Sequence, residues 1–295
     1  MRYRTVVIGL GTIAHYHVAG MQQSDRFNLC AVCDLREETA HDPLWSDLPF
    51  YRDYKEMLKT VHPDVAIIAT PPATHLIIAR ACVACNVIPF VEKPLAATKE
   101  EGEIFFANEL QGKFVPVCHT LYGQEMLWMT ENLPMNKMDS IRMTLCDPYA
   151  DKNGHIAERY KALGGSWLDS APNALAPLLR IVPKLENVAV QHMRDEQSGI
   201  PYASKLTAQY NATNIVFDIA WHRGINHKQT EIEADGKHIL IDHSKQMVKV
   251  NDQVVFCAEG DRLTQQYANF YRLYPARVPN SKMLKEMYRI IWIND

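Results

Sequence analysis

The feature that most constrains this chain is the run Gly9-Leu10-Gly11-Thr12-Ile13-Ala14, which directly follows the apolar segment Val6-Val7-Ile8. A G-x-G-x-x-A run between a buried strand and a helix is typical of the turn that binds a dinucleotide. Gly9 permits the tight turn, and Gly11 lets the backbone approach the pyrophosphate. Thr12 and Ile13 open the expected helix, whose N-terminus stabilises the phosphate charge. The sequence therefore predicts a dinucleotide-binding strand, turn and helix.

An acidic residue ends the second expected strand, at residues 27–34. Asp34 lies where a carboxylate accepts hydrogen bonds from the adenosine ribose hydroxyls. The same carboxylate repels a 2′-phosphate, so NAD is favoured. Arg36 keeps NADP open, because a guanidinium can pair with that phosphate. The alternative reading is purely structural, with a glycine in a turn and an aspartate that caps a helix.

Apolar runs alternate with segments of helical period over the first third of the chain. Strands are expected at residues 4–9, 27–34, 65–69, 87–91 and 114–118, and helices at 12–22, 54–61, 74–85 and 98–111. Strands that are apolar throughout and separated by helices imply a parallel sheet covered on both faces. Residues 1–119 are therefore expected to form a doubly wound α/β domain, a Rossmann domain that binds a dinucleotide.

Short strand candidates dominate the rest of the chain. Strands are expected at residues 140–145, 188–193, 205–211, 215–221, 229–234, 238–242, 246–250 and 253–256, and helices at 168–181, 263–273 and 281–291. Asp235-Gly236 and Asn251-Asp252 fit tight hairpin turns. Residues 120–295 are therefore expected to form an α+β domain with a mostly antiparallel sheet.

Composition excludes several classes of function. With 31 Lys+Arg against 34 Asp+Glu, the net charge of −3 is a poor footprint for nucleic acid or an anionic membrane. No apolar run has the length of a membrane span, and the N-terminus does not resemble a signal peptide, so we expect a cytoplasmic protein. Seven cysteines then fit reduced thiols. The twelve histidines form no metal-binding signature, so no metal is expected.

Two further segments follow expected strands of the first domain, and both are expected to meet the cofactor. The first contains Thr70, Pro71 and His75, and the second contains Glu92, Lys93 and Pro94. The carboxyl ends of parallel strands are where an open α/β sheet binds its ligand. A lysine flanked by a glutamate and fixed by a proline is placed for chemistry there. The alternative is a solvated loop cation.

Taken together, the Gly9–Ala14 run, Asp34, the segment from Ala69 to His75 and Glu92-Lys93-Pro94 resemble the Gfo/Idh/MocA family of glucose–fructose oxidoreductases and inositol dehydrogenases. The resemblance covers the whole chain. It implies a Rossmann domain and a second domain with a large open-faced sheet, which binds substrate and pairs subunits into a homodimer or homotetramer. It implies NAD or NADP as cofactor and a sugar or polyol as substrate. It also implies that Lys93 contacts the reacting hydroxyl and that a cis bond precedes Pro94.

The second domain carries the more discriminating motif. Many family members have G-G-x-x-x-D-x-G-x-H, and here Asp169 matches the aspartate whereas Asn173 stands at the histidine. Positions i and i+4 share a helix face, but asparagine cannot take up a proton at neutral pH. Proton transfer then falls to Lys93 or Asp169, while Asn173 orients the hydroxyl. The run from Asp169 to Leu175 and the segment Phe217-Asp218-x-x-Trp221 also resemble bacterial galactose and arabinose 1-dehydrogenases, which oxidise C1 of a cyclic aldose.

Four other residues are candidates for contact with the substrate. His119 follows the last strand of the first domain, Asp147 and Asp151 follow the first strand of the second, and Trp167 could stack on a sugar ring. Each has a plain alternative, as a structural histidine, a solvated loop or a core tryptophan. His15 and His17 do not share a helix face and read as structural.

These observations predict an NAD(P)-dependent oxidoreductase that transfers hydride between C1 of a cyclic aldose and nicotinamide, with catalytic residues Lys93, Asp169 and Asn173. One alternative keeps the class but moves the carbon, to a polyol or inositol ring hydroxyl, or to a carbonyl that is reduced. A second alternative is a regulatory protein that senses a dinucleotide without turning over a substrate.

Overall fold

The computed structural model describes residues 2–107, 109–222 and 224–294, and within them the chain forms two compact units. The first unit contains the chain up to His119 together with Leu263–Ser281, and the second contains Thr120–Arg262 and the chain from Lys282 on. The sequence-based division placed residues 263–281 in the second domain. They group with the first unit because helix α8 (Arg262–Leu273) packs Phe270 and Tyr271 against Phe90 and Phe27 of the first sheet.

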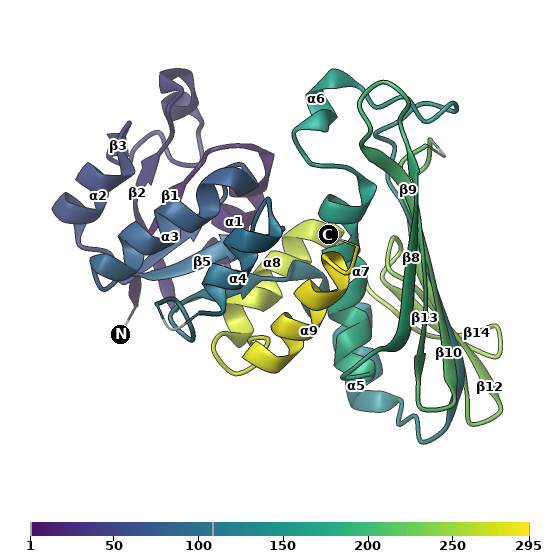
Figure 1. Cartoon of the computed structure of the whole chain (residues 1–295). Helices are drawn as coiled ribbons and strands as arrows, with labels where there is room; N and C mark the ends of the chain where they lie inside the picture. Colours follow the sequence, from purple (N-terminus) through teal and green to yellow (C-terminus); the bar gives the residue numbers. More distant parts are fainter. Residues whose placement is uncertain (1, 108, 223, 295) are drawn as a thin grey trace. The chain divides into compact units, whose positions relative to one another are not determined.

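The first unit is built on a six-stranded parallel sheet in the order β3-β2-β1-β4-β5-β6. Figure 1 labels β1, β2, β3 and β5 of this sheet. Its strands are β1 Tyr3–Ile8, β2 Phe27–Cys33, β3 Phe50–Tyr51, β4 Val65–Ile68, β5 Ile88–Glu92 and β6 Val115–Val117. Its other helices are α1 Thr12–Gln22, α2 Tyr54–Val61, α3 His75–Ala84 and α4 Lys99–Phe105, with short 3-10 turns at Glu37–His41 and Pro72–Thr74 and one that begins at His119. This strand order is that of a dinucleotide-binding Rossmann sheet. The doubly wound parallel sheet expected from the sequence is confirmed.

Several elements differ from expectation, and two short ones, β3 and the helix Glu158–Lys161, were not expected. The helix expected at 98–111 ends at Phe105, and the chain tightens into turns whose amides bond three residues back, from Phe106 to Glu103 and from Ala107 to Ile104. Residue 108 of that expected helix lies outside the described residues. Helix α5 (Gln124–Asn132), in the second unit, was not expected, because its buried methionines give little apolar contrast with their neighbours.

The second unit contains an eight-stranded sheet in the order β14-β13-β12-β11-β7-β10-β9-β8. Neighbouring strands are antiparallel except for β7 and β10, so the mostly antiparallel sheet is confirmed. Its strands are β7 Met138–Cys146, β8 Glu186–Arg194, β9 Pro201–Tyr210, β10 Thr213–Ala220, β11 His227–Ala234, β12 Lys237–Asp242, β13 Met247–Val250 and β14 Gln253–Cys257. Both expected hairpin turns form, with positive φ at Asp235-Gly236 and Asn251-Asp252.

Helix α7 (Ser166–Ile181) packs along one face of this sheet against β9, β10 and β7, and Figure 1 shows α5 on the same side. The short helix α6 (Glu158–Lys161) precedes α7. Helix α9 (Ser281–Ile291) is bonded to α7, because the Trp167 indole donates to the carbonyl of Ile291 at 2.8 Å. Alternate residues of β9, such as Lys205 and Thr207, lie exposed on the other face. None of the described helices is long and apolar enough to cross a membrane.

Candidate functional site

The turn after β1 has the backbone that a dinucleotide requires. Gly9 has a φ of +91°, and a Cβ atom there would lie 2.7 Å from the carbonyl group of Ala69. Gly11 precedes α1, and a Cβ on it would meet nothing within 4 Å. Among the described residues no side chain caps the N-terminus of α1, and its first turn, which begins with Thr12 and Ile13, has no acidic residue. Uncapped N–H groups facing open space fit a pyrophosphate, so the residues present fit NAD.

Asp34 follows β2 and is tied back to this turn. Its Oδ2 accepts a hydrogen bond from the Leu10 amide at 2.7 Å, and its Oδ1 accepts from the Arg36 amide at 2.9 Å. The Arg36 guanidinium adds contacts of 3.2 and 3.3 Å to the two oxygens. Burial raises the pKa of Asp34, but the hydrogen bonds from Arg36 and Leu10 outweigh it and leave the pKa below its usual value. Asp34 is thus an ionised acceptor, and Arg36 would have to leave it to pair with a 2′-phosphate.

His75 joins the loops that follow β4 and β5. It is fully buried, with Nε2 2.8 Å from the carbonyl oxygen of Thr70 and Nδ1 3.0 Å from that of Pro94. Burial lowers the pKa of His75. Both ring nitrogens face backbone carbonyls, so the ring joins the two loops. Thr70 lies at the glycine turn, because its methyl group is 2.9 Å from where a Gly9 Cβ would be, and Pro71 follows it in the chain.

Glu92 and Lys93 end β5, and the Lys93–Pro94 peptide bond is cis, as the family resemblance implies. Lys93 is half-buried, whereas Glu92 is buried and accepts hydrogen bonds from Tyr267 and His17. Sequence reasoning gave neither partner a functional place. A signal existed for His17, because it shares the buried face of α1 with Ala14, Val18 and Met21.

His119 is the last residue of the first segment of the first unit. Its Nδ1 lies 2.9 Å from Oε1 of Gln266, and its ring stacks on Tyr267 with centroids 5.3 Å apart. The residue is buried, and both neighbours belong to α8. This geometry favours the reading of His119 as a structural histidine.

The first unit therefore brings most of its predicted residues to one edge of the sheet. The loops after β1, β4 and β5 follow neighbouring strands at their carboxyl ends. We call the group the strand-end cluster, and its members are Gly9, Gly11, Asp34, Thr70 and Lys93. The N-terminus of α1 and the glycine turn can hold the pyrophosphate of a dinucleotide, and Asp34 can accept from its ribose. Lys93 can then place an amine beside it.

In the second unit, Asp169 and Asn173 lie one turn apart on α7. Asp169 is buried in the first turn of the helix, and Asn173 is half-buried. Their spacing puts both side chains on one face of the helix. A single ligand at that face could meet a carboxylate and an amide.

Asp147 follows β7 and is buried in an ion pair that sequence reasoning missed. Its Oδ1 lies 2.6 Å from Nζ of Lys228, and its Oδ2 accepts a hydrogen bond from the Ser170 hydroxyl at 3.0 Å. Ser170 in turn accepts one from the Trp221 indole at 3.1 Å. Lys228 alternates with buried Thr230 and Ile232 along β11, so its place on the inner face was a readable signal. Asp147 therefore braces the start of α7, next to Asp169.

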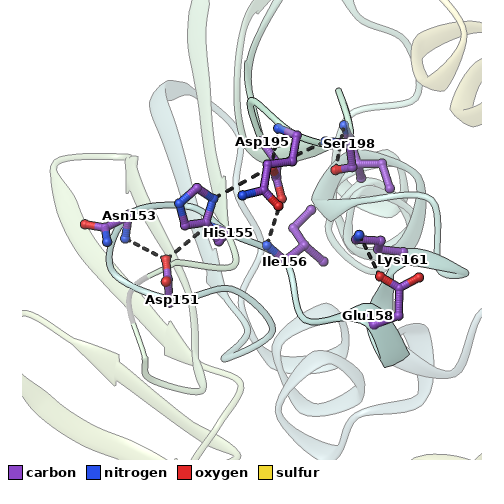
Figure 2. Close-up of polar contacts among 10 residues, drawn as sticks. Asp151, Asn153, His155, Ile156, Glu158, Lys161, Asp195 and Ser198 are labelled. Carbon is purple, nitrogen blue, oxygen red and sulfur yellow. Dashed lines mark hydrogen bonds and ion pairs between the residues drawn. The ribbon is translucent and has the colours of Figure 1, made fainter.

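Asp151 closes its own loop, as Figure 2 shows. Its Oδ1 accepts hydrogen bonds from the amides of Asn153 at 2.8 Å and His155 at 3.0 Å. Nearby, the amides of Ile156 and Gln197 hold the pKa of Asp195 at about 2 (Figure 2). The structure thus gives Asp147 and Asp151 separate partners and does not pair them. Trp167 is also occupied, since its ring is buried and packs against His192.

Residues 3–113 match the model of the Gfo/Idh/MocA family, described as an oxidoreductase family with an NAD-binding Rossmann fold. This part of the first unit is therefore similar to the NAD-binding part of that family. Inositol 2-dehydrogenase of Salmonella paratyphi B is 27% identical in an alignment of 118 residues that covers 38% of this chain and 35% of that enzyme. The match thus spans about a third of this curated relative.

Solved structures match over the whole length. A levoglucosan dehydrogenase in complex with NADH superimposes with a TM-score of 0.84 at 16% identity, covering 100% of this chain and 95% of that one. The UDP-N-acetylglucosamine 3-dehydrogenase of Acidithiobacillus ferrooxidans gives a TM-score of 0.82 at 15% identity, covering 99% and 96%. At these identities the likeness establishes the fold. The fold of the first unit thus agrees with the NAD-binding Rossmann fold that the family model describes.

Proposed function

We propose that this chain is an NAD(P)-dependent dehydrogenase that acts on a CH–OH group of a sugar or polyol, with C1 of a cyclic aldose as the first candidate carbon. The observation that carries the proposal is the strand-end cluster, in which an uncapped helix N-terminus and an ionised Asp34 share one sheet edge with Lys93. A bound NAD would accept the hydride from the carbon, or return it. Asp34 paired with Arg36 favours NAD over NADP.

Each residue has one task in this proposal. Gly9 and Gly11 admit the pyrophosphate, and Asp34 accepts from the ribose hydroxyls. Lys93 hydrogen-bonds the reacting hydroxyl, and either its Nζ or an oxygen of Asp169 takes the hydroxyl proton. Asn173 orients that hydroxyl without taking up a proton. The protein is further proposed to act in the cytoplasm as a homodimer or homotetramer. Light scattering, which measures the mass of the assembly, tests the number of subunits.

A ring hydroxyl is the second candidate for the reacting group. The relatives support it by name, because one is an inositol 2-dehydrogenase and another a UDP-N-acetylglucosamine 3-dehydrogenase. Asn173 supports C1 instead, because it stands at the histidine of the inositol dehydrogenases and matches the aldose 1-dehydrogenases. The substrate test must therefore separate C1 from the other carbons.

The test is reduction of NAD⁺ and of NADP⁺, followed at 340 nm, across free aldoses and their methyl glycosides. The glycosides block the anomeric hydroxyl and leave the others free. Reduction with free sugars alone is the expected result. Reduction with both sets would move the reaction to a ring hydroxyl. Tight dinucleotide binding without turnover of any sugar or polyol would favour the alternative, a regulatory protein that senses a dinucleotide.

A further inference from the structure

Glu92 is a buried carboxylate with an unusual set of partners. Only 4% of its surface is exposed, yet its two oxygens accept three hydrogen bonds. Oε1 accepts from the Tyr267 hydroxyl at 2.6 Å and from His17 Nε2 at 3.0 Å, and Oε2 accepts from the backbone amide of Lys93 at 3.0 Å. The third bond ties this carboxylate directly to the lysine of the strand-end cluster.

The partners come from parts of the chain far apart in sequence. His17 is on α1, the helix that begins at the glycine turn, and Tyr267 is on α8, 175 residues after Glu92. A second layer fixes them, because the Tyr271 hydroxyl bonds His17 Nδ1 and the His119 ring stacks on Tyr267. Because α8 belongs to the first unit, its Tyr267 reaches the carboxylate at the end of β5.

The carboxylate stays ionised despite its burial. Burial raises its pKa, but the hydrogen bond and charge of His17, the charge of His119 and the Tyr267 hydroxyl outweigh it and bring the pKa of Glu92 to about 2. An apolar side chain could fill the same space without the cost of desolvating a charge. The arrangement therefore holds a negatively charged acceptor in place at the backbone amide of Lys93.

We propose that Glu92 is the positioning residue of Lys93, anchored by Tyr267 and His17: it holds the Lys93 backbone and supplies a fixed negative charge to the lysine ammonium group. The proposal rests on the proposed function only in that Lys93 serves the substrate hydroxyl. Among the described residues, the other titratable groups that face Glu92 include Tyr271, His119, Cys118 and His75.

The first test measures Lys93 itself and needs no substrate. Lys93 is half-buried, so competitive acetylation followed by peptide mass spectrometry can report its reactivity against pH. In Glu92→Gln the lost negative charge lowers the pKa of the lysine, and labelling at neutral pH should be about tenfold faster. Glu101→Gln is the matched control, because Glu101 accepts from the Ala97 amide in the same loop, and it should label like the wild type. An unchanged rate in Glu92→Gln would overturn the proposal.

A second variant covers the case in which Glu92→Gln does not fold. Tyr267→Phe removes one anchor and keeps the charge on Glu92. Its kcat should fall about tenfold with an unchanged KM for NAD, while Lys93 labels within about twofold of the wild-type rate. Tyr274→Phe is the control, because Tyr274 packs its ring on Phe27 and Phe90. Wild-type kcat in Tyr267→Phe would reject the anchor. Wild-type protein inactive on every sugar would reject the proposed function and leave the labelling result standing.

Discussion

Each unit has a buried carboxylate at the end of a sheet strand, Glu92 in the first and Asp147 in the second, and these two are stabilised in opposite ways. Glu92, in the first unit, is held by a tyrosine hydroxyl, a histidine and an amide. Asp147, in the second unit, is held by the ammonium group of Lys228 and the hydroxyl of Ser170. The second carboxylate is paired with the ammonium group of Lys228, whereas the first accepts from the backbone amide of Lys93. The difference teaches that burial alone does not reveal a role, and that the partners do.

Replacing Lys93 should have the largest effect. Lys93→Met removes the amine at the reacting hydroxyl, and general acid–base catalysis contributes about 10²–10⁴-fold, so kcat should fall by about a thousandfold. Dinucleotide affinity, measured by fluorescence titration, should stay within about twofold of the wild type, because Gly9, Gly11 and Asp34 are untouched.

Two further variants sharpen this result. Lys113→Met changes an exposed lysine of the same unit and should leave kcat unchanged. Asp169→Asn should match the loss in Lys93→Met if Asp169 takes the proton, and lose much less if Lys93 does. Full turnover in Lys93→Met would remove the lysine from the mechanism.

Breaking the ion pair of the second unit should have the next largest effect, on stability. Lys228→Met leaves Asp147 charged, buried and without its cation, which costs about 3–5 kcal/mol of unfolding free energy. Urea unfolding followed by tryptophan fluorescence reports it, since Trp167 and Trp221 both lie in this unit.

A double variant tests the cause. Lys228→Met with Asp147→Leu replaces both charges by apolar groups, and it should recover most of the lost stability. Wild-type stability in Lys228→Met alone would show that the pair contributes nothing. The comparison between the two buried carboxylates would then fail.

Local sequence patterns anticipated most of the fold. The apolar strands and the spacing of the helices predicted the parallel sheet, and Asp235-Gly236 predicted a hairpin whose φ values are indeed positive. Short-range motifs also placed Gly9 and Lys93 at the ends of two strands of the same sheet, β1 and β5. These features depend on residues close together in the chain, so one sequence is enough to read them.

The partners of those residues were not readable in the same way. The bond from Tyr267 to Glu92 joins residues 175 positions apart, and no local period encodes it. Asp151 poses a different difficulty, because its local pattern has two readings: an aspartate after a strand fits a ligand contact and an Asx turn equally well. Lys228 was missed although the alternation along β11 placed it on the buried face.

Acid should weaken the first unit through Glu92. Its pKa is about 2 in the fold against an ordinary 4.5, so its contribution is full above pH 4.5 and is lost as the pH falls toward 2. The 2.5-unit difference corresponds to a contribution on the order of 3 kcal/mol. Urea midpoints measured between pH 7 and pH 3 should therefore converge for the wild type and Glu92→Gln. A constant gap across that range would show that the carboxylate is not the group that titrates.

The smallest effect is expected at Asp151, four residues from Asp147 but exposed. Both contacts to its Oδ1 come from backbone amides of its own loop, so the side chain shapes the turn. Asp151→Asn keeps an oxygen that can accept both bonds, and its KM for the sugar should stay within about twofold of the wild type. Asp151→Ala removes both acceptors of the turn and serves as the comparison. Its KM for the sugar should rise if the shape of the loop matters for binding. A KM at least tenfold higher in Asp151→Asn would mean that the carboxylate charge itself meets the substrate. That outcome would break the contrast between a buried acid that braces a helix and an exposed acid that only closes a loop.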